Sequence, residues 1–196
     1  MFVLWDSLVA RYGWRTILTP RCPTIFWQHS KLILKGDTFR FPEVRERFVK
    51  GFGERGIDPS RVELRLASSH AQLLAEYADV DIALDPFPYN GGATTCDALW
   101  MGVPVVTRQG DSMISRQSAA MLAALAMPEL VARDDDAYLA IATRLAASLA
   151  RLETLRGSLR HIMAASPLCD AERFSDAFMQ RMRQAWREWC EHEHSS

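Results

Sequence analysis

The chain has 196 residues, and its 23 Lys and Arg residues nearly balance its 24 Asp and Glu residues. This balance excludes a nucleic-acid-binding protein that relies on an overall positive field, so any anion site must be local. The 48% hydrophobic content suffices for the core of one domain, and no segment is long or apolar enough to cross a bilayer. We therefore expect a cytoplasmic domain without nucleic-acid or membrane partners.

Residues 1–30 give the weakest structural signals. The spacing of apolar residues favours a short helix over residues 2–12. Residues 16–27 contain two prolines and two aromatic residues, and we assign no element to them. Residues 1–30 as a whole are left as an unassigned segment.

From residue 31 onward, short apolar runs alternate with helical patterns. Alternating strands and helices predict an α/β fold with a doubly wound parallel sheet, and we expect the helical C-terminal end to pack across that sheet. The predicted strands cover residues 31–35, 61–66, 82–84, 105–106 and 130–131, and the predicted helices cover residues 42–55, 71–78, 93–100, 114–125, 138–148, 152–165 and 171–193.

The loop between residues 84 and 93 has a composition suited to an anion. Its two prolines and two glycines exclude a continuing strand, and a helix of small residues and threonines begins at Ala93. Free N–H groups point outward from a helix N-terminus, where the helix dipole favours negative charge. The pattern therefore indicates a phosphate site, although a Thr-capped helix with nothing bound is the alternative.

Three ordered segments resemble one protein family. They are residues 81–107, the pair Ser115-Arg116 followed by a small-residue helix, and Ser166-Pro167-Leu168. Together they resemble the C-terminal half of the catalytic region of protein O-linked N-acetylglucosamine transferases, including the bacterial SPINDLY-like relatives.

The resemblance covers roughly residues 31 to 189. It implies that residues 31–196 form the Rossmann-like, nucleotide-sugar-binding C-terminal lobe of a GT-B glycosyltransferase. The tetratricopeptide repeats that often precede this region are absent from the sequence.

The resemblance also implies a donor site for a UDP-sugar. Gly92, Ala93 and Thr94 would bind the diphosphate, and Asp97 would accept hydrogen bonds from the ribose hydroxyls. The nucleoside would contact the segment that contains His70, although a solvent-facing histidine at a helix start is an equal alternative. The candidate donor-binding residues are Ser68, Ser69, His70, Asn90, Gly91, Gly92, Ala93, Thr94, Thr95 and Asp97.

Several positions depart from the family pattern. Gly92 and Ala93 stand where animal members carry His and Thr, so mainly backbone donors remain. Leu73 and Glu76 replace nucleoside-contacting His and Arg, and we interpret them as a core residue and a solvated residue. No lysine precedes Lys31, so the lysine that meets the departing phosphate has no counterpart before it.

Two further features have structural and functional readings. Arg116 contacts the ligand or forms an ion pair that shapes the loop before it. The aromatic residues Phe174, Phe178, Trp186 and Trp189 share one face of the last helix. That face is expected to pack in the core or against another lobe, with an oligomer surface as the alternative.

The sequence predicts no metal site. Asp79-Val80-Asp81 has the spacing of a metal-binding DxD motif, but the segment runs into a strand without a ligand-presenting loop. The acidic run at residues 134–136 reads as a helix start. The four cysteines form no CxxC pair and the histidines no HExxH motif, so free thiols are expected.

The leading hypothesis is the donor-binding part of a glycosyltransferase. It would transfer N-acetylglucosamine from UDP-GlcNAc to Ser or Thr hydroxyls of proteins, without a cofactor or metal. No catalytic residue is identified, and a missing N-terminal lobe or a tetratricopeptide region is expected as a partner, so the chain alone should be weakly active or inactive. The alternatives are a truncated or divergent non-catalytic nucleotide-binding module and, less favoured, a Rossmann enzyme for dinucleotides, which the absence of GxGxxG after the first clear strand disfavours.

Overall fold

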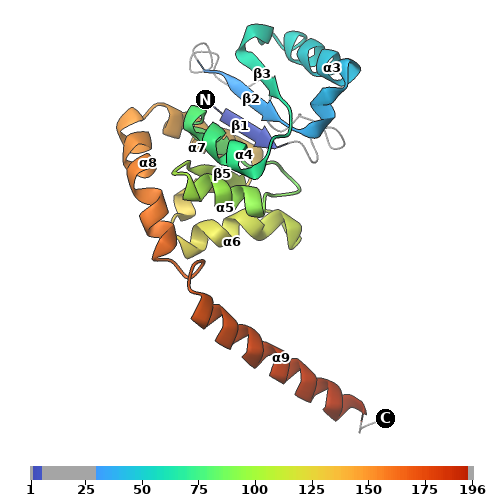
Figure 1. Ribbon diagram of the computed structural model, residues 1–196, viewed down its shortest axis with the longest axis vertical. Coiled ribbons are helices and arrows are strands. Elements are labelled where there is room, and N and C mark those ends of the chain that lie inside the picture. The colour runs from blue at the N-terminus through green and yellow to red at the C-terminus, as the bar shows by residue number, and fades with distance from the viewer. Residues whose placement is uncertain (1, 6–29, 194–196) are drawn as a thin grey trace.

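The computed structural model describes residues 2–5 and 30–193, and its centre is a parallel sheet (Figure 1). Within this part of the chain, six strands lie in the order β3-β2-β1-β4-β5-β6, and each recorded pairing is parallel. From β1 at the centre, the chain adds β2 and β3 on one side of the sheet and then β4, β5 and β6 on the other side. This topology confirms the predicted doubly wound sheet. The strands are β1 (Phe2–Trp5), β2 (Leu32–Lys35), β3 (Val62–Arg65), β4 (Ile82–Leu84), β5 (Val105–Arg108) and β6 (Val131–Ala132).

The N-terminal strand β1 corrects the sequence interpretation. A helix was predicted over residues 2–12, whereas Phe2–Trp5 pairs with β2 on one side and β4 on the other. A four-residue apolar segment is too short for its periodicity to separate helix from strand, and long-range pairing decides its structure. The rest of that predicted helix and the unassigned residues 16–27 lie outside the described residues.

The helices largely follow the predicted pattern, with ends that shift by a few residues. Proline at the first position starts α3, a Ser69–Gln72 capping box starts α4, and the side chain of Asp134 accepts a hydrogen bond from Ala137 N–H at the start of α7. The helices are α3 (Pro42–Gly53), α4 (His70–Glu76), α5 (Ala93–Trp100), α6 (Gln117–Ala124), α7 (Asp135–Ala146), α8 (Leu149–Ala164) and α9 (Ala171–Glu193).

One hydrophobic core joins the sheet to the helices around it. The strands β2 and β4 are buried along their whole length, as expected for strands covered on both faces. Leu99 of α5, Leu122 of α6 and Leu159 of α8 are completely buried in the same cluster. Burial of each such side chain contributes roughly 1.5–3 kcal/mol, so these helices are held firmly against the sheet.

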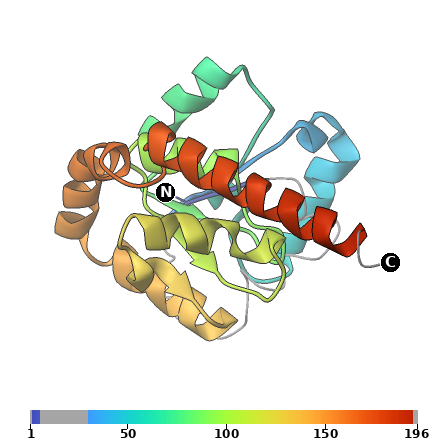
Figure 2. The same cartoon turned by 90° about the horizontal axis from the view of Figure 1, so that it is seen from below.

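The last helix, α9, does not join this core. It runs away from the rest of the molecule after α8, as Figure 1 shows, and Figure 2 looks from the end to which it extends. Its aromatic residues are exposed, with Phe174 at 68% and Trp186 at 64%. The expectation that the helical end packs across the sheet therefore holds for α7, whereas α8 packs against α5 and α7. Packing of α9 in the core is wrong for the described part of the chain. An amphipathic pattern shows that a helix has an apolar face, but it does not identify what covers that face.

Candidate functional site

The candidate site lies at the carboxyl ends of the strands, where the strand order reverses. The sequence crosses from β3 through α4 to β4, and β4 lies on the other side of β1. In doubly wound sheets, ligands bind in the crevice outside the carboxyl ends at such a switch point. Two segments flank it here: the start of α4, and the loop from Asp85 to Gly92 that leads from β4 into α5.

Backbone donors are available at the N-terminus of α5. Gly92 O accepts hydrogen bonds from the N–H groups of Thr95 and Cys96, which closes the first turn of the helix. Within the described part of the chain, the N–H groups of Gly92, Ala93 and Thr94 have no acceptor. Three consecutive free donors at the positive end of a helix can bind an anion such as a phosphate.

Two of the predicted contact residues turn their side chains into the protein. Asn90 is completely buried, and its Nδ2 donates to Pro86 O at 2.9 Å. Thr95 is also buried, and its Oγ1 lies 2.8 Å from Ser118 Oγ. These side chains therefore support the loop from inside, which leaves the backbone and the partly exposed Thr94 on the side of the proposed ligand.

Gly91 occupies a position where a side chain has no space. A Cβ there would lie 2.6 Å from Thr95 Oγ1, 2.7 Å from Thr94 Oγ1 and 3.2 Å from Asp85 Oδ1. Because real Cβ atoms do not come this close to other atoms, only glycine fits between these three oxygens. The glycine signal in the sequence thus reflects close packing inside the loop.

Asp97 and His70 come together across the candidate site. His70 Nε2 lies 3.2 Å from Asp97 Oδ1, although the residues are 27 positions apart in the sequence. The Asp97 side chain is 19% exposed and that of His70 is 68% exposed, so the second carboxylate oxygen of Asp97 can still accept a hydrogen bond. The structure therefore joins the predicted ribose residue to the predicted nucleoside segment.

Ser68 and Ser69 both form hydrogen bonds with residues of α4. Ser69 forms the capping box with Gln72, and Ser68 Oγ donates to Glu76 Oε1 at 3.0 Å. Both serines are exposed, so their hydroxyls lie at the surface near His70. Their visible role is to fix the start of the helix that presents His70.

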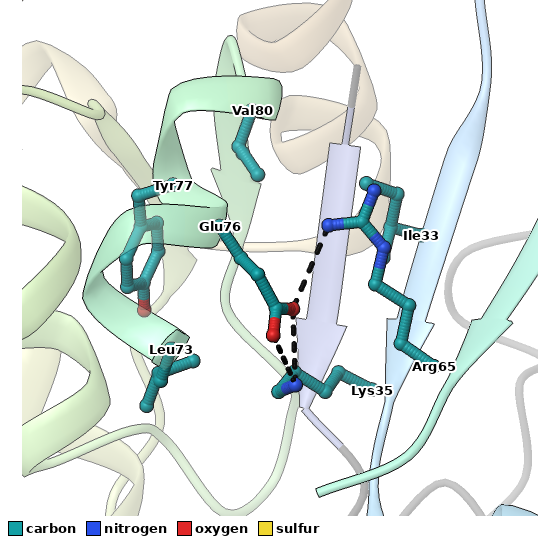
Figure 3. A pocket seen from close by; sticks show the side chains of 7 residues that line it. All are labelled: Ile33, Lys35, Arg65, Leu73, Glu76, Tyr77 and Val80. Carbon is teal, nitrogen blue, oxygen red and sulfur yellow. Dashed lines mark hydrogen bonds and ion pairs between the residues drawn. The ribbon is translucent and has the colours of Figure 1, made fainter. Parts of the chain in front are cut away.

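Glu76 does not face solvent freely, which corrects its interpretation as a solvated residue. Lys35 Nζ donates to its Oε1 at 2.8 Å and to its Oε2 at 2.9 Å, and Arg65 Nη1 lies 3.5 Å from Oε2 (Figure 3). Burial acts to raise the pKa of Glu76, but the contacts with Lys35, Ser68 and Arg65 outweigh it and lower the pKa. No local sequence pattern indicated this pairing, because the residues come from three separate elements.

The cluster of Lys35, Arg65 and Glu76 lines a small pocket between α4 and the sheet. Figure 3 shows the charged groups converging on one side of it, and Leu73, Tyr77, Ile33 and Val80 form the apolar remainder. Leu73 also packs against the hydrophobic core, as predicted. These contacts tie α4, and with it His70, to the central strands.

Asp85 is a buried residue that sequence reasoning missed. It follows β4 directly and is 5% exposed. Its Oδ1 accepts a hydrogen bond from Gly91 N–H at 2.7 Å, and its Oδ2 accepts one from Thr107 Oγ1 at 2.6 Å. Burial raises the pKa of Asp85 to about 6, although the bonds from Thr107 and Gly91 act to lower it. A charged residue at the end of an apolar strand was the available signal.

The loop before α6 is shaped by serines. Ser115 N–H and Oγ bond to Ser112, and Gly110 N–H donates to Ser115 O at 2.9 Å. Arg116 is exposed, and its guanidinium has no hydrogen bond or ion pair with any described residue. The loop-fixing ion pair considered for Arg116 therefore has no counterpart in this part of the chain.

Within residues 2–5 and 30–193, no group of three or more His, Cys, Asp or Glu side chains could hold a metal ion. Asp79 of the DxD sequence instead lies 3.0 Å from Arg65 Nη2. No disulfide bond joins the described cysteines, Cys96, Cys169 and Cys190, and Cys22 lies outside the described residues. No helix in the same ranges has the length and apolar character needed to span a membrane.

Comparison with known proteins identifies relatives over most of the chain. The family model described as glycosyl transferase family 41 matches residues 24–178. A probable UDP-N-acetylglucosamine–peptide N-acetylglucosaminyltransferase SPINDLY from Petunia hybrida is 39% identical over 165 residues, which are 83% of this chain and 18% of that protein. A UDP-N-acetylglucosamine–peptide N-acetylglucosaminyltransferase from Caenorhabditis elegans is 31% identical over 151 residues, or 76% of this chain and 13% of that protein. The chain thus spans less than a fifth of the curated relatives it matches.

Solved structures show the same architecture. A mutant of the Thermobaculum terrenum O-GlcNAc transferase aligns with a TM-score of 0.82 and 29% identity, over 97% of this chain and 36% of that chain. Sucrose-phosphate synthase from Thermosynechococcus elongatus aligns with a TM-score of 0.61 and 21% identity, over 95% of this chain and 46% of that chain. The second likeness concerns the fold alone. The predicted GT-B lobe with a helical C-terminal end is confirmed.

Proposed function

Because the chain belongs to glycosyl transferase family 41, we propose that it is the donor-binding part of an enzyme that transfers N-acetylglucosamine from UDP-GlcNAc to Ser or Thr hydroxyls of proteins. Its relatives carry the name of that activity, and the loop before α5 supplies suitable chemistry. The observation that carries the proposal is the row of free N–H groups at Gly92–Thr94, one helical turn from Asp97 at the switch point of the sheet.

In this proposal the donor diphosphate lies against the N-terminus of α5. The amides of Gly92, Ala93 and Thr94 bind its oxygens, and the Thr94 hydroxyl adds one donor. Asp97 accepts hydrogen bonds from the ribose, and His70, held 3.2 Å from Asp97, lies where it can contact the nucleoside. Gly91, Asn90 and Thr95 shape the loop from within.

The proposed reaction is displacement at the anomeric carbon, with UDP as the leaving group. The oxygen of the acceptor hydroxyl forms the new bond to that carbon as the bond to the β-phosphate oxygen breaks, and the hydroxyl proton passes to solvent or to a base outside this chain. Negative charge then develops on the diphosphate, where fixed amide dipoles and the end of α5 stabilise it without reorganisation. We propose that this stabilisation requires no metal ion.

The exposed face of α9 fits the proposed need for a second lobe. Phe174, Phe178, Trp186 and Trp189 leave one side of a 23-residue helix apolar and exposed. An apolar stripe of this length on a helix is typical of a surface that another element covers. We assign it to packing against the part of the enzyme that binds the protein acceptor.

Isothermal titration of the chain with UDP tests the donor site. Thr94→Val removes one hydroxyl donor and should weaken UDP by up to about tenfold, and Asp97→Ala should weaken it by about tenfold or more. Thr154→Val and Asp176→Ala change the same residue types on exposed surfaces of α8 and α9 and should leave affinity unchanged. Unchanged affinity in both site variants would contradict the placement.

Two added arms of the same titration separate the remaining readings. Repeating the UDP titration with a chelator should not alter affinity, whereas a large loss would show a metal requirement. Titration with NAD should show no binding, and NAD binding in place of UDP would favour a dinucleotide enzyme.

A labelling assay separates an enzyme from a non-catalytic nucleotide-binding module. We expect the chain alone, with radiolabelled UDP-GlcNAc and a peptide mixture, to label near background. Catalysis requires donor and acceptor to be held together, and the acceptor side is proposed to lie in another lobe. Robust labelling by this chain would show that it contains more of the active site than proposed.

A further inference from the structure

Asp85 holds a fixed position inside the candidate donor loop. Its own N–H donates to Val106 O at 2.9 Å, and its O accepts a hydrogen bond from the Tyr138 hydroxyl at 3.0 Å. Its carboxylate adds the bonds from Thr107 and Gly91, so β5, α7 and the loop all converge on it. Because both carboxylate oxygens of Asp85 accept hydrogen bonds, the side chain is held in one position and can in turn fix the position of Gly91.

The carboxylate of Asp85 forms one half of a clamp on Gly91. Oδ1 accepts from Gly91 N–H at 2.7 Å, and Ser118 Oγ of α6 donates to Gly91 O at 3.1 Å. In a planar trans peptide, the N–H points opposite to the C=O of the preceding residue. Holding Gly91 O against Ser118 therefore directs the N–H of Gly92 the other way, toward the free end of α5.

The two partners of the carboxylate explain why an acidic residue stands here. Gly91 N–H and the Thr107 hydroxyl are both donors, and a carboxylate offers an acceptor oxygen to each. Among residues 2–5 and 30–193, no Lys, Arg or His pairs with Asp85, so only neutral donors offset the burial that disfavours the charged form of its carboxylate. A residue that served only to fill the core would not need these acceptor oxygens.

We propose that Asp85 is a positioning residue for the donor diphosphate, because its bond to Gly91 orients the amides of Gly92, Ala93 and Thr94 toward the ligand. This inference rests on the proposed function. Asp85 itself lies behind the loop and does not touch the donor. Its contribution should therefore appear in the binding of phosphate groups and be absent from the binding of the nucleoside.

The test compares four variants of the full chain by titration with UDP and by ligand-observed NMR with uridine. Asp85→Ala removes the acceptor for Gly91 and should weaken UDP tenfold or more. Asp85→Asn keeps one acceptor oxygen for Gly91, while its amide can donate to Thr107, so affinity should stay within about threefold of the wild type. Uridine binding should be unchanged in both.

Thr107→Val is the matched control, because it removes the other bond of the same carboxylate and leaves the bond to Gly91 intact. It should lower stability while UDP affinity stays within about threefold. Ser118→Ala removes the second half of the clamp and should weaken UDP severalfold. This variant also carries the comparison if Asp85→Ala does not fold.

The outcomes separate the two proposals. If Asp85→Ala and Ser118→Ala both bind UDP with the affinity of the wild type, the positioning role is overturned and the proposed function still stands. A parallel loss of UDP and uridine affinity, or an equal loss of UDP affinity in Thr107→Val, would reduce Asp85 to a structural residue. Failure of the wild type to bind UDP would overturn both proposals.

Discussion

The two segments that flank the candidate site are held in place by different chemistry. The loop before α5 is organised around the buried carboxylate of Asp85, whose recorded partners are the neutral donors Gly91 and Thr107. The helix α4 on the other side is anchored by charges, since Glu76 pairs with Lys35 and Arg65. Asp85 and Lys35 are almost equally buried, at 5% and 4% exposure.

This difference shows how the choice of partner determines the state of a buried charge. Contacts with cations lower the pKa of Glu76, whereas Asp85, without such a partner, has its pKa raised to about 6. The α4 anchor should therefore respond most strongly to loss of one partner, and the loop to pH and to side-chain volume. Four measurements test this difference between the two segments.

Glu76→Ala should produce the largest effect. It leaves the buried Lys35 with Leu66 O as its remaining recorded partner, and an uncompensated buried charge costs roughly 3–5 kcal/mol of unfolding free energy. Urea denaturation at pH 7 measures the loss. The double variant Lys35→Met with Glu76→Leu removes both charges and should recover most of the stability. A loss below about 1 kcal/mol for Glu76→Ala would remove the contrast between the two segments.

The pH dependence of Asp85 should have the next largest effect. The folded chain holds this proton up to about pH 6, whereas the unfolded chain releases it near the ordinary pKa of 3.8. The stability contributed by this group is therefore highest at low pH and falls as pH rises through this window, by about 3 kcal/mol in all.

Comparison with Asp85→Asn isolates this contribution, because the amide does not titrate. The unfolding free energy of the wild type minus that of the variant should fall by about 3 kcal/mol between pH 3 and pH 7 in denaturant titrations. Glu76 titrates with the opposite sign in both proteins and cancels in the difference. A difference that stays constant with pH would contradict the raised pKa.

Gly91→Ala should have a smaller effect. The added methyl group meets Thr95 Oγ1 at 2.6 Å and Thr94 Oγ1 at 2.7 Å, and such overpacking costs roughly 1–3 kcal/mol. Gly157→Ala is the control, since nothing lies within 4 Å of its added Cβ in α8, and it should stabilise the chain by up to about 1 kcal/mol. Thermal unfolding measures the midpoint temperature of both variants. Equal shifts in this temperature would show that the loop accommodates the added methyl group by a small rearrangement.

Asp79→Asn should have the smallest effect. Its carboxylate is 52% exposed and pairs with Arg65, so its loss should cost at most about 1 kcal/mol. The same urea titration measures it, and added salt should weaken the wild-type advantage further. A loss as large as that of Glu76→Ala would mean that the charged anchor extends to the surface.

The sequence alone determined the family, the doubly wound sheet and most of its elements. Alternating apolar runs and helical patterns are local signals, so they identified the strands at residues 31–35 and 82–84 and the helix α5 without knowledge of contacts. The loop of prolines and glycines before Ala93 likewise indicated a helix N-terminus with free donors. The resemblance to the family is confirmed by relatives over 83% of the chain.

Contacts between residues that are distant in the sequence became known from the folded chain alone. The strand identity of Phe2–Trp5 depends on pairing with β2 and β4, and the exposure of α9 depends on what the rest of the chain leaves uncovered. The contacts Lys35–Glu76, Asp85–Thr107 and His70–Asp97 join residues 41, 22 and 27 positions apart. A local pattern shows which residues can form an element and which faces are apolar. Burial, hydrogen-bond partners and pKa depend on the other elements that the fold brings alongside.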